Sequence, residues 1–271
     1  MIEHRLKFTL LGTGSSGGVP RIGNDWGACD PSEARNRRLR CSALAEVYAS
    51  NAPAKRTQVL IDTSPDLRQQ LLRECTDRLD AVVISHDHAD QTHGLDDLRA
   101  LAIKARSPIN IYMDSFTSRS LTNKFEYCFK DKGGYPAILK EKSHLKAGEA
   151  LTIQGPGGEL TLLPLEQIHG RIKSLGFRIG NLAYCNDVNE IPVQSLNQLT
   201  SLDVFIVDAL RYSPHPTHAH LEKTLSWIAA VKPKRAILTN LHVDMDYATL
   251  KRQLPEGVEP GFDGVCIDIA I

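Results

Sequence analysis

Three histidines and two aspartates lie within residues 85–94, directly after an apolar run. The segment reads Ser-His-Asp-His-Ala-Asp-Gln-Thr-His-Gly. Imidazole nitrogens and carboxylate oxygens are common protein ligands of first-row divalent metals. Because alternate residues of an extended segment point the same way, we expect His86 and His88 to converge on one ion and Asp90 to extend their face. The cluster therefore predicts a metal site, and the alternative is a histidine-rich surface loop.

Further ligand candidates follow apolar runs that are typical of strands. His169, Asp187 and His242 each stand at or just after the end of such a run. A single histidine or a turn aspartate in such a place is often structural, so these assignments depend on the histidine pair described above. Asn240 is the alternative to His242, which is favoured because imidazole is the better ligand.

A second group of histidines, His215, His218 and His220, precedes an apolar helical pattern. A histidine that titrates near neutrality can protonate a departing alkoxide. Asp208, at the end of the preceding apolar run, could orient one of these imidazoles or bind a metal. The alternative is that the histidines cap the helix and lie in solvent.

A glycine-rich turn at residues 11–20 leads into a loop that contains several arginines. Its spacing differs from that of a P-loop or a dinucleotide-binding fingerprint. Guanidinium groups are well suited to binding phosphate oxygens. We therefore expect Ser16, Arg37 and Arg38 to bind the substrate. The alternative for the glycine-rich segment is a tight turn without a binding role, and the alternative for the arginines is a solvated run of charge.

Taken together, these motifs resemble the metallo-beta-lactamase superfamily of metal-dependent hydrolases. The usual family pattern, His-x-His-x-Asp-His, is matched except that Gln91 takes the place of the last histidine. The glycine-rich and arginine-containing loops resemble those of its PhnP-like branch of cyclic-phosphate phosphodiesterases. The resemblance extends from Leu11 to Gly264 and implies an α/β fold, a four-layer αββα sandwich.

The resemblance also implies a dinuclear metal site. Its expected ligands are His86, His88, Asp90, Gln91, His169, Asp187 and His242, with Asp187 bridging the two ions. The expected cofactors are two divalent ions, zinc or manganese, with iron also compatible. An amide oxygen, such as that of Gln91, is a weaker ligand for zinc than imidazole and suits harder ions. By the same resemblance, the catalytic residues are His218, near the leaving group, and Asp90.

The implied activity is hydrolysis of a small phosphodiester, such as a cyclic phosphate of a ribose or nucleotide. A bound metal lowers the pKa of water from about 15.7 toward about 7, and the resulting hydroxide would attack phosphorus. Three alternatives stay open. They are a tRNA-processing endonuclease, for which no separate basic insertion is visible, a carbonyl ester, thioester or lactone hydrolase, and a member that binds metal or ligand without turnover.

Strands and helices alternate along the chain and must position these residues. Strands are expected at 7–11, 42–49, 58–62, 81–84, 110–113, 160–164, 174–179, 182–186, 204–208, 236–240 and 264–269. Helices are expected at 65–74, 95–105, 115–125, 221–231 and 247–253. Periodicity alone does not distinguish the αββα sandwich from other mixed α/β folds. No linker is visible, so we expect a single domain over residues 1–271.

Composition excludes several classes of protein. The 32 basic and 32 acidic residues cancel, so there is no global basic field for nucleic acid or an anionic membrane. The first residues lack the apolar core of a signal peptide, and no run reaches about 18 apolar residues. The six cysteines form no C-x-x-C pair, which predicts free thiols. We expect a cytoplasmic protein with a small phosphorylated substrate and neither a stable nucleic-acid partner nor a membrane; a homodimer is left open.

Overall fold

The computed structural model describes residues 3–271, and the chain divides into two compact units. Unit 1 takes the N-terminal segment up to Leu11 together with Ser42–Thr161 and Cys266–Ile271. Unit 2 takes Gly12–Cys41 and Leu162–Val265. Each unit therefore combines segments that are distant in sequence. The expectation of a single domain stays a prediction.

Unit 1 is built on a seven-stranded sheet with the order β14-β1-β2-β3-β4-β5-β6. Its strands are β1 (His4–Gly12), β2 (Ser42–Ala49), β3 (Thr57–Ile61), β4 (Ala81–Val83), β5 (Ile109–Tyr112), β6 (Leu139–Glu141) and β14 (Cys266–Ala270). The strands from β3 to β6 are parallel, whereas β2 and β14 pair antiparallel with β3 and β1. The carboxyl ends of the parallel strands consequently meet at one edge of this sheet.

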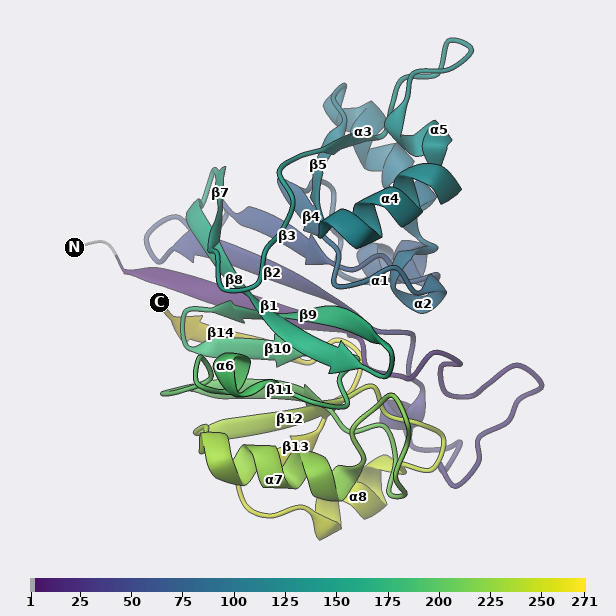
Figure 1. Cartoon of the computed structure of the whole chain (residues 1–271), viewed down its shortest axis with the longest axis vertical. Helices are drawn as coiled ribbons and strands as arrows, with labels where there is room; N and C mark the ends of the chain where they lie inside the picture. The colour runs from purple at the N-terminus through teal and green to yellow at the C-terminus, as the bar shows by residue number, and fades with distance from the viewer. Residues whose placement is uncertain (1–2) are drawn as a thin grey trace. The chain divides into compact units, whose positions relative to one another are not determined.

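Along the chain, the helices of unit 1 connect its parallel strands (Figure 1). They are α1 (Leu67–Arg73), α2 (Ala89–Thr92), η2 (Leu95–Leu98), α3 (Arg99–Ala105), α4 (Ser115–Lys124) and α5 (Glu126–Phe129). Leu98 and Leu121 from the helices share one buried apolar cluster with Val82 and Ile111 from the strands. Burial of these apolar side chains is the main force that holds the helices on the sheet.

The second sheet has the order β13-β12-β11-β10-β9-β8-β7. Its strands are β7 (Leu151–Gly155), β8 (Gly158–His169), β9 (Ile172–Ile179), β10 (Leu182–Cys185), β11 (Val204–Asp208), β12 (Arg235–Thr239) and β13 (Val258–Pro260). β7 and the first residues of β8, through Thr161, are counted with unit 1. The strands from β10 to β13 are parallel, whereas β9 is antiparallel to both β8 and β10.

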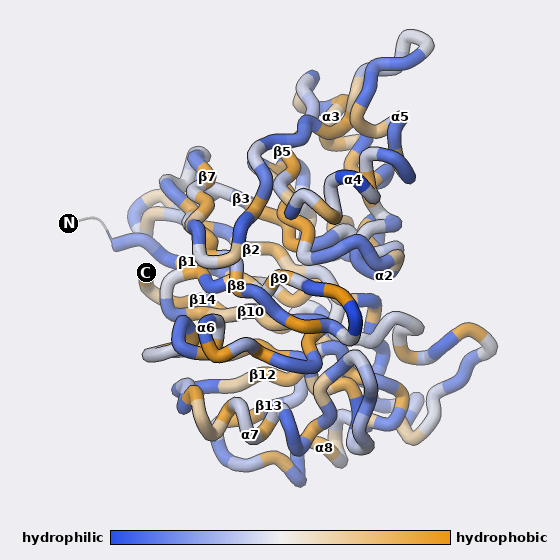
Figure 2. The backbone as a smooth tube through the Cα atoms, in the orientation of Figure 1, coloured by the Kyte–Doolittle hydropathy of each residue, from blue (hydrophilic) through white to orange (hydrophobic). Residues whose placement is uncertain are grey.

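The helices of unit 2 are η1 (Ala34–Asn36), α6 (Val193–Leu196), α7 (Leu221–Val231) and α8 (Tyr247–Gln253). Trp227 and Ile228 of α7 are buried in one apolar cluster with Phe205 and Leu238 of the strands. Hydrophobic and hydrophilic residues are both present along α7, as Figure 2 shows, and its buried residues include Trp227 and Ile228. α7 is therefore amphipathic and is fixed by its apolar side.

The α/β class, with two mixed sheets and helices attached to each, is confirmed. The expected strands at 42–49 and 204–208 and helices at 221–231 and 247–253 have the bounds observed. The short strands β6, β7 and β13 were missing from the expectation. Each of the three has at most five residues and is defined by its partner strand, so its own sequence carries little signal.

Two further expectations concern the cysteines and the membrane. All six cysteines are free thiols, as expected, and four of them are buried. Among the described residues, no helix has the length and apolar character needed to cross a bilayer.

Candidate metal centre

Four polar residues of unit 2 end or follow strands that run in one direction. In the parallel register, Cys185 of β10 pairs with Val207 of β11, and Asp208 pairs with Thr239 of β12. Asp187, Asp208 and Asn240 therefore come at the same edge of the sheet. His169 ends β8, which runs in the direction of β10 because both strands are antiparallel to β9.

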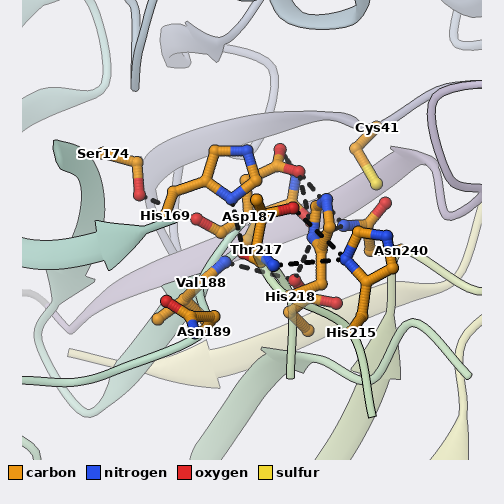
Figure 3. A network of polar contacts seen from close by, with 12 residues as sticks. Cys41, His169, Ser174, Asp187, Val188, Asn189, His215, Thr217, His218 and Asn240 are labelled. Atoms are coloured by element: carbon orange, nitrogen blue, oxygen red, sulfur yellow. Dashed lines mark hydrogen bonds and ion pairs between the residues drawn. The ribbon is translucent and has the colours of Figure 1, made fainter. Parts of the chain in front are cut away.

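This edge brings together three residues that the sequence had singled out (Figure 3). His169, Asp187 and His218 each offer one ligand atom, and these atoms all lie within 4.8 Å of one another. His169 is 3% exposed and Asp187 is 2% exposed. The rings of His169 and His218 meet edge to face with centroids 4.5 Å apart. The close approach of two imidazoles and a carboxylate is typical of a metal site.

Hydrogen bonds fix the tautomer of both histidines. Nδ1 of His218 lies 2.8 Å from Oδ2 of Asp208, and Nδ1 of His169 lies 2.7 Å from the carbonyl oxygen of Thr217. An ionised carboxylate and a carbonyl can only accept, so each Nδ1 carries the proton and each Nε2 carries the lone pair. Metal-binding histidines usually donate their second nitrogen to a carboxylate or carbonyl in this way.

Asp187 is held by amide donors on both of its oxygens. Nδ2 of Asn186 donates to Oδ2 at 2.8 Å, and Nδ2 of Asn240 donates to Oδ1 at 3.1 Å. The carbonyl of Asp187 also accepts from the hydroxyl of Ser174 at 2.8 Å. These contacts set the orientation of the carboxylate before any ligand binds.

Unit 1 presents a second set of donors at the end of β4. The rings of His86 and His88 lie edge to face with centroids 4.6 Å apart, so the pair is close together, as expected. The Ser85 hydroxyl donates to Oδ2 of Asp62 at 2.8 Å and therefore accepts from Nδ1 of His86 at 3.0 Å. His86 thus has the same tautomer as His169 and His218.

Asp62 is a site residue that the sequence reasoning missed. It follows β3, is fully buried, and also accepts from the backbone N–H of Ser85 at 2.7 Å. Burial raises the pKa of its carboxyl to about 7, although the hydrogen bonds from Ser85 act in the opposite direction. Its signal was an aspartate directly after a strand, at the sheet edge where His86 also lies.

Asp90 and Gln91 lie in α2, the short helix that follows His88. Asp90 is half-buried, and its charge contributes to the raised pKa of Asp62. Gln91 is 1% exposed. Its backbone carbonyl oxygen accepts a hydrogen bond from the backbone N–H of Thr63 at 2.8 Å. The helix is thereby anchored to the segment that follows Asp62.

In unit 2, two imidazoles of defined tautomer with a carboxylate beside them fit a divalent metal, and in unit 1 His86 and His88 offer two further imidazoles. The ligand atoms are imidazole nitrogens and carboxylate oxygens, which suit zinc, manganese and iron. The partners of Nδ1, namely Asp208, Thr217 and Ser85, are the kind of second layer that orients metal ligands.

The structure places His242 differently from the expectation. Its Nδ1 lies 3.0 Å from Oδ2 of Asp244, and its Nε2 contacts the guanidinium of Arg21. Among the described residues, the groups of converging ligand atoms do not include His242. The side chain beside Asp187 is that of Asn240, so the structure gives no support to His242 as a metal ligand.

Arg38 is also placed differently from the expectation, because it is only 1% exposed. It donates to the carbonyl of Met245 at 2.8 Å and to Oδ1 of Asn36 at 3.3 Å, which favours a structural role over substrate binding. Arg37 is exposed and lies over the ring of Trp26, 5.1 Å from its centroid. Ser16 is exposed in the glycine-rich turn.

Two further side chains belong to the network of Figure 3. The centroid of His215 lies 5.2 Å from that of His218. Burial and then the neighbouring His218 lower the pKa of His215, which favours its neutral form. The Cys41 thiol is fully buried, and burial followed by the charge of Asp187 raises its pKa well above the usual value. Cys41 is therefore a neutral thiol and a poor nucleophile.

Comparisons with known proteins show the family and the fold of this chain. The model of the beta-lactamase superfamily domain matches residues 57–240. A crystal structure described as a new diphosphatase from the PhnP family has a TM-score of 0.87 and 34% identity, covering 98% of each chain. The zinc-bound PqqB of Methylobacterium extorquens has a TM-score of 0.72 and 15% identity, covering 97% of this chain and 100% of PqqB, which shows the fold alone.

A curated relative from Porphyromonas gingivalis bears the name octanoyltransferase. It is 31% identical over 264 residues, which cover 96% of this chain and 51% of that protein. The chain thus spans about half the length of this relative.

Proposed function

Because this chain belongs to the metallo-beta-lactamase superfamily of metal-dependent hydrolases, we propose that it cleaves a phosphoester or diphosphate bond in a small phosphorylated substrate. The cyclic phosphate of a ribose or nucleotide is the phosphodiester that we favour. The similarity to a PhnP-family diphosphatase over nearly the full length supports a phosphoryl substrate.

The observation that carries this proposal is the pair of His218 and Asp208 beside two metal-ligand candidates. Nδ1 of His218 lies 2.8 Å from Oδ2 of Asp208, and the ligand atom of His218 is within 4.8 Å of those of His169 and Asp187. An imidazole oriented by a buried carboxylate is a common device for proton transfer. Its position beside the metal donors suits transfer of a proton to a departing oxygen.

Each residue has a defined part in this mechanism. His169 and Asp187 would hold the metal in unit 2, and His86 and His88 are the metal-ligand candidates of unit 1. A bound metal would supply Lewis acidity and a nucleophile from water at neutral pH. His218, in its protonated form, gives the proton on Nε2 to the leaving oxygen. Asp208 accepts from Nδ1 throughout and stabilises the positive ring, so it is a positioning residue.

Substrate binding is assigned to the exposed residues of the loops that begin unit 2. Arg37 presents a guanidinium at the surface, which suits a terminal phosphate or a non-bridging oxygen. Ser16 offers a hydroxyl in the glycine-rich turn. Arg38 is left out of this proposal because its side chain is buried.

The test is hydrolysis of a chromogenic phosphodiester and of a dinucleoside diphosphate by metal-stripped protein, before and after zinc or manganese is restored. We expect turnover only with metal. His218→Ala and Asp208→Asn should each lower kcat by about 10²- to 10⁴-fold, the usual contribution of proton transfer. The double variant should lose little more than His218→Ala alone, because the two residues act as a unit.

Asp203→Asn is the matched control. Asp203 is another aspartate of unit 2, but it pairs with Lys234 at the surface, so its loss should leave kcat unchanged. Metal-dependent turnover that survives in both His218→Ala and Asp208→Asn would refute the assigned proton donor. Absence of turnover on every phosphoryl substrate, with metal bound, would refute the proposed function.

A carboxylic thioester is a second candidate substrate. The relative named octanoyltransferase motivates this candidate, since it is 31% identical over 96% of this chain, which spans 51% of that protein. The same metal chemistry can serve attack on a carbonyl carbon. Comparison of kcat/KM for an octanoyl thioester and for the phosphodiester, in the same metal-loaded sample, ranks the two substrates directly.

A further inference from the structure

Asn240 lies beside the cluster of possible metal ligands in unit 2, which consists of His169, Asp187 and His218. It follows β12, is 1% exposed, and its Nδ2 lies 3.1 Å from Oδ1 of Asp187 and 3.1 Å from Nδ1 of His218. Figure 3 shows its side chain among those of the cluster. The residue that completes this edge of the sheet is therefore an amide.

The amide of Asn240 changes what Asp187 can do. A carboxylate that bridges two metal ions uses one oxygen for each ion. Oδ1 of Asp187 accepts from Asn240, while Oδ2 accepts from Asn186. Asn240 thus donates to one of the two oxygens that a bridge would use, and it brings no imidazole to bind a second ion.

The nearest imidazole in the sequence does not replace it. His242 is two residues further along, and its ring nitrogens contact Asp244 and Arg21. Unit 1 also has an amide where the family pattern His-x-His-x-Asp-His has its last histidine. This residue is the buried Gln91, directly after Asp90. Amide oxygens are weaker ligands than imidazole for transition metals.

We infer that this protein binds one transition-metal ion tightly, with Asp187 among its ligands, and that Asn240 sets this number. Asn240 is a positioning residue that orients Asp187. This inference rests on the proposed function only in taking the same metal centre as the catalytic one. It revises the expectation of two ions.

The substitution Asn240→His tests this role directly. Asn240 has a left-handed backbone with φ of 60°, which histidine tolerates better than most residues. An imidazole there would remove the amide donor from Oδ1 of Asp187 and add a nitrogen ligand beside it. His242→Ala is the matched control, because it removes an imidazole two residues away that is not among the converging donors.

The experiment measures metal content per chain by elemental analysis after metal-stripped protein is loaded with zinc and gel filtered. Absorption of the cobalt-loaded protein reports the coordination of each bound ion. We expect one tightly bound ion in the wild type and in His242→Ala, and two in Asn240→His. The cobalt spectrum of His242→Ala should match that of the wild type.

Two tightly bound ions in the wild type would overturn the inference, and loss of one in His242→Ala would identify the missing ligand. A folded Asn240→His that still holds a single ion would overturn the role of Asn240. If circular dichroism shows that this variant is unfolded, the wild type and His242→Ala still decide the number of ions. None of these measurements uses a substrate, so failure of the proposed hydrolysis is seen separately.

Discussion

Asp62, Asp187 and Asn240 share a backbone conformation that residues other than glycine seldom adopt. Their φ angles are 61°, 49° and 60°. Aspartate and asparagine tolerate the left-handed region better than most side chains, and such strained residues cluster at functional sites. In each case the residue lies just beyond a strand, and the unusual turn sets the direction of a polar side chain that contacts a metal-ligand candidate or is one itself.

The carboxyl of Asp62 should make the stability of the metal-free protein depend on pH. Its pKa in the folded protein is about 7, against an ordinary value of 3.8. A raised carboxyl pKa means that the folded state favours the protonated form. Stability is therefore lost as pH rises from about 4 to about 7, by roughly 4 kcal/mol at most, and is regained as pH falls.

The substitution Asp62→Asn isolates this contribution. Asparagine keeps the left-handed backbone and cannot ionise, so stability should fall less between pH 4 and pH 7 in the variant than in the wild type. The measurement is the free energy of unfolding in urea at several pH values, with a chelator present. If the free energy of unfolding changes equally with pH in the two proteins, Asp62 does not titrate in this range.

At the scale of elements, parallel strands explain why the site residues meet. The strands from β10 to β12 deliver Asp187, Asp208 and Asn240 to one edge, and β3 and β4 deliver Asp62 and His86 to one edge of the other sheet. Each unit thus carries its donors at the carboxyl ends of its parallel strands, the usual place for ligand binding in open α/β sheets.

Gly94, just after α2, allows a close approach that this edge of unit 1 requires. A Cβ atom there would lie 2.2 Å from the carbonyl oxygen of Ser64 and 2.8 Å from Cβ of Leu67. Gly94→Ala should therefore push α2 away from α1. We expect the free energy of unfolding to fall by about 3 kcal/mol, together with weaker metal binding, because Asp62 and His88 flank the displaced segments.

Urea unfolding and zinc titration check this expectation, with Gly133→Ala as the control. A Cβ at Gly133 meets no atom within 4 Å, so the cost there comes only from its left-handed φ of 60° and should be about 1 kcal/mol. Equal destabilisation by the two substitutions would argue against a packing role for Gly94.

For the whole molecule, bound metal should act as a stabilising ligand. A ligand that binds only the folded state at 1,000 times its Kd adds about 4 kcal/mol, which corresponds to a rise in Tm of roughly 10 °C for a chain of this size. We expect this rise when zinc is restored to metal-stripped protein. In Asp187→Asn, which weakens a donor without changing the fold, the rise should be smaller.

Differential scanning calorimetry with chelator and with zinc gives this comparison. An unchanged Tm on metal addition, or an equal response of the wild type and Asp187→Asn, would contradict the expected coupling of metal to folding.

The α/β class and the principal metal-ligand candidates could be predicted from sequence. Residue type and spacing carry that information, because His-x-His after an apolar run and a histidine or aspartate after other apolar runs are local patterns. The helix α7 was predicted with its observed bounds, since an apolar face fixes a helix wherever it packs, whereas the longest strand, β8, was predicted only at 160–164.

Tertiary structure alone decided which residues act together. Which of Asn240 and His242 lies beside Asp187 depends on where β12 ends and how the chain turns, and a shift of two residues is invisible in composition. The pairing of Ser85 with Asp62 and the burial of Arg38 likewise arise from contacts between distant segments. Sequence thus determined which ligand and proton-donor groups are present. The register of the strands and the left-handed turns after them determined which of these groups meet.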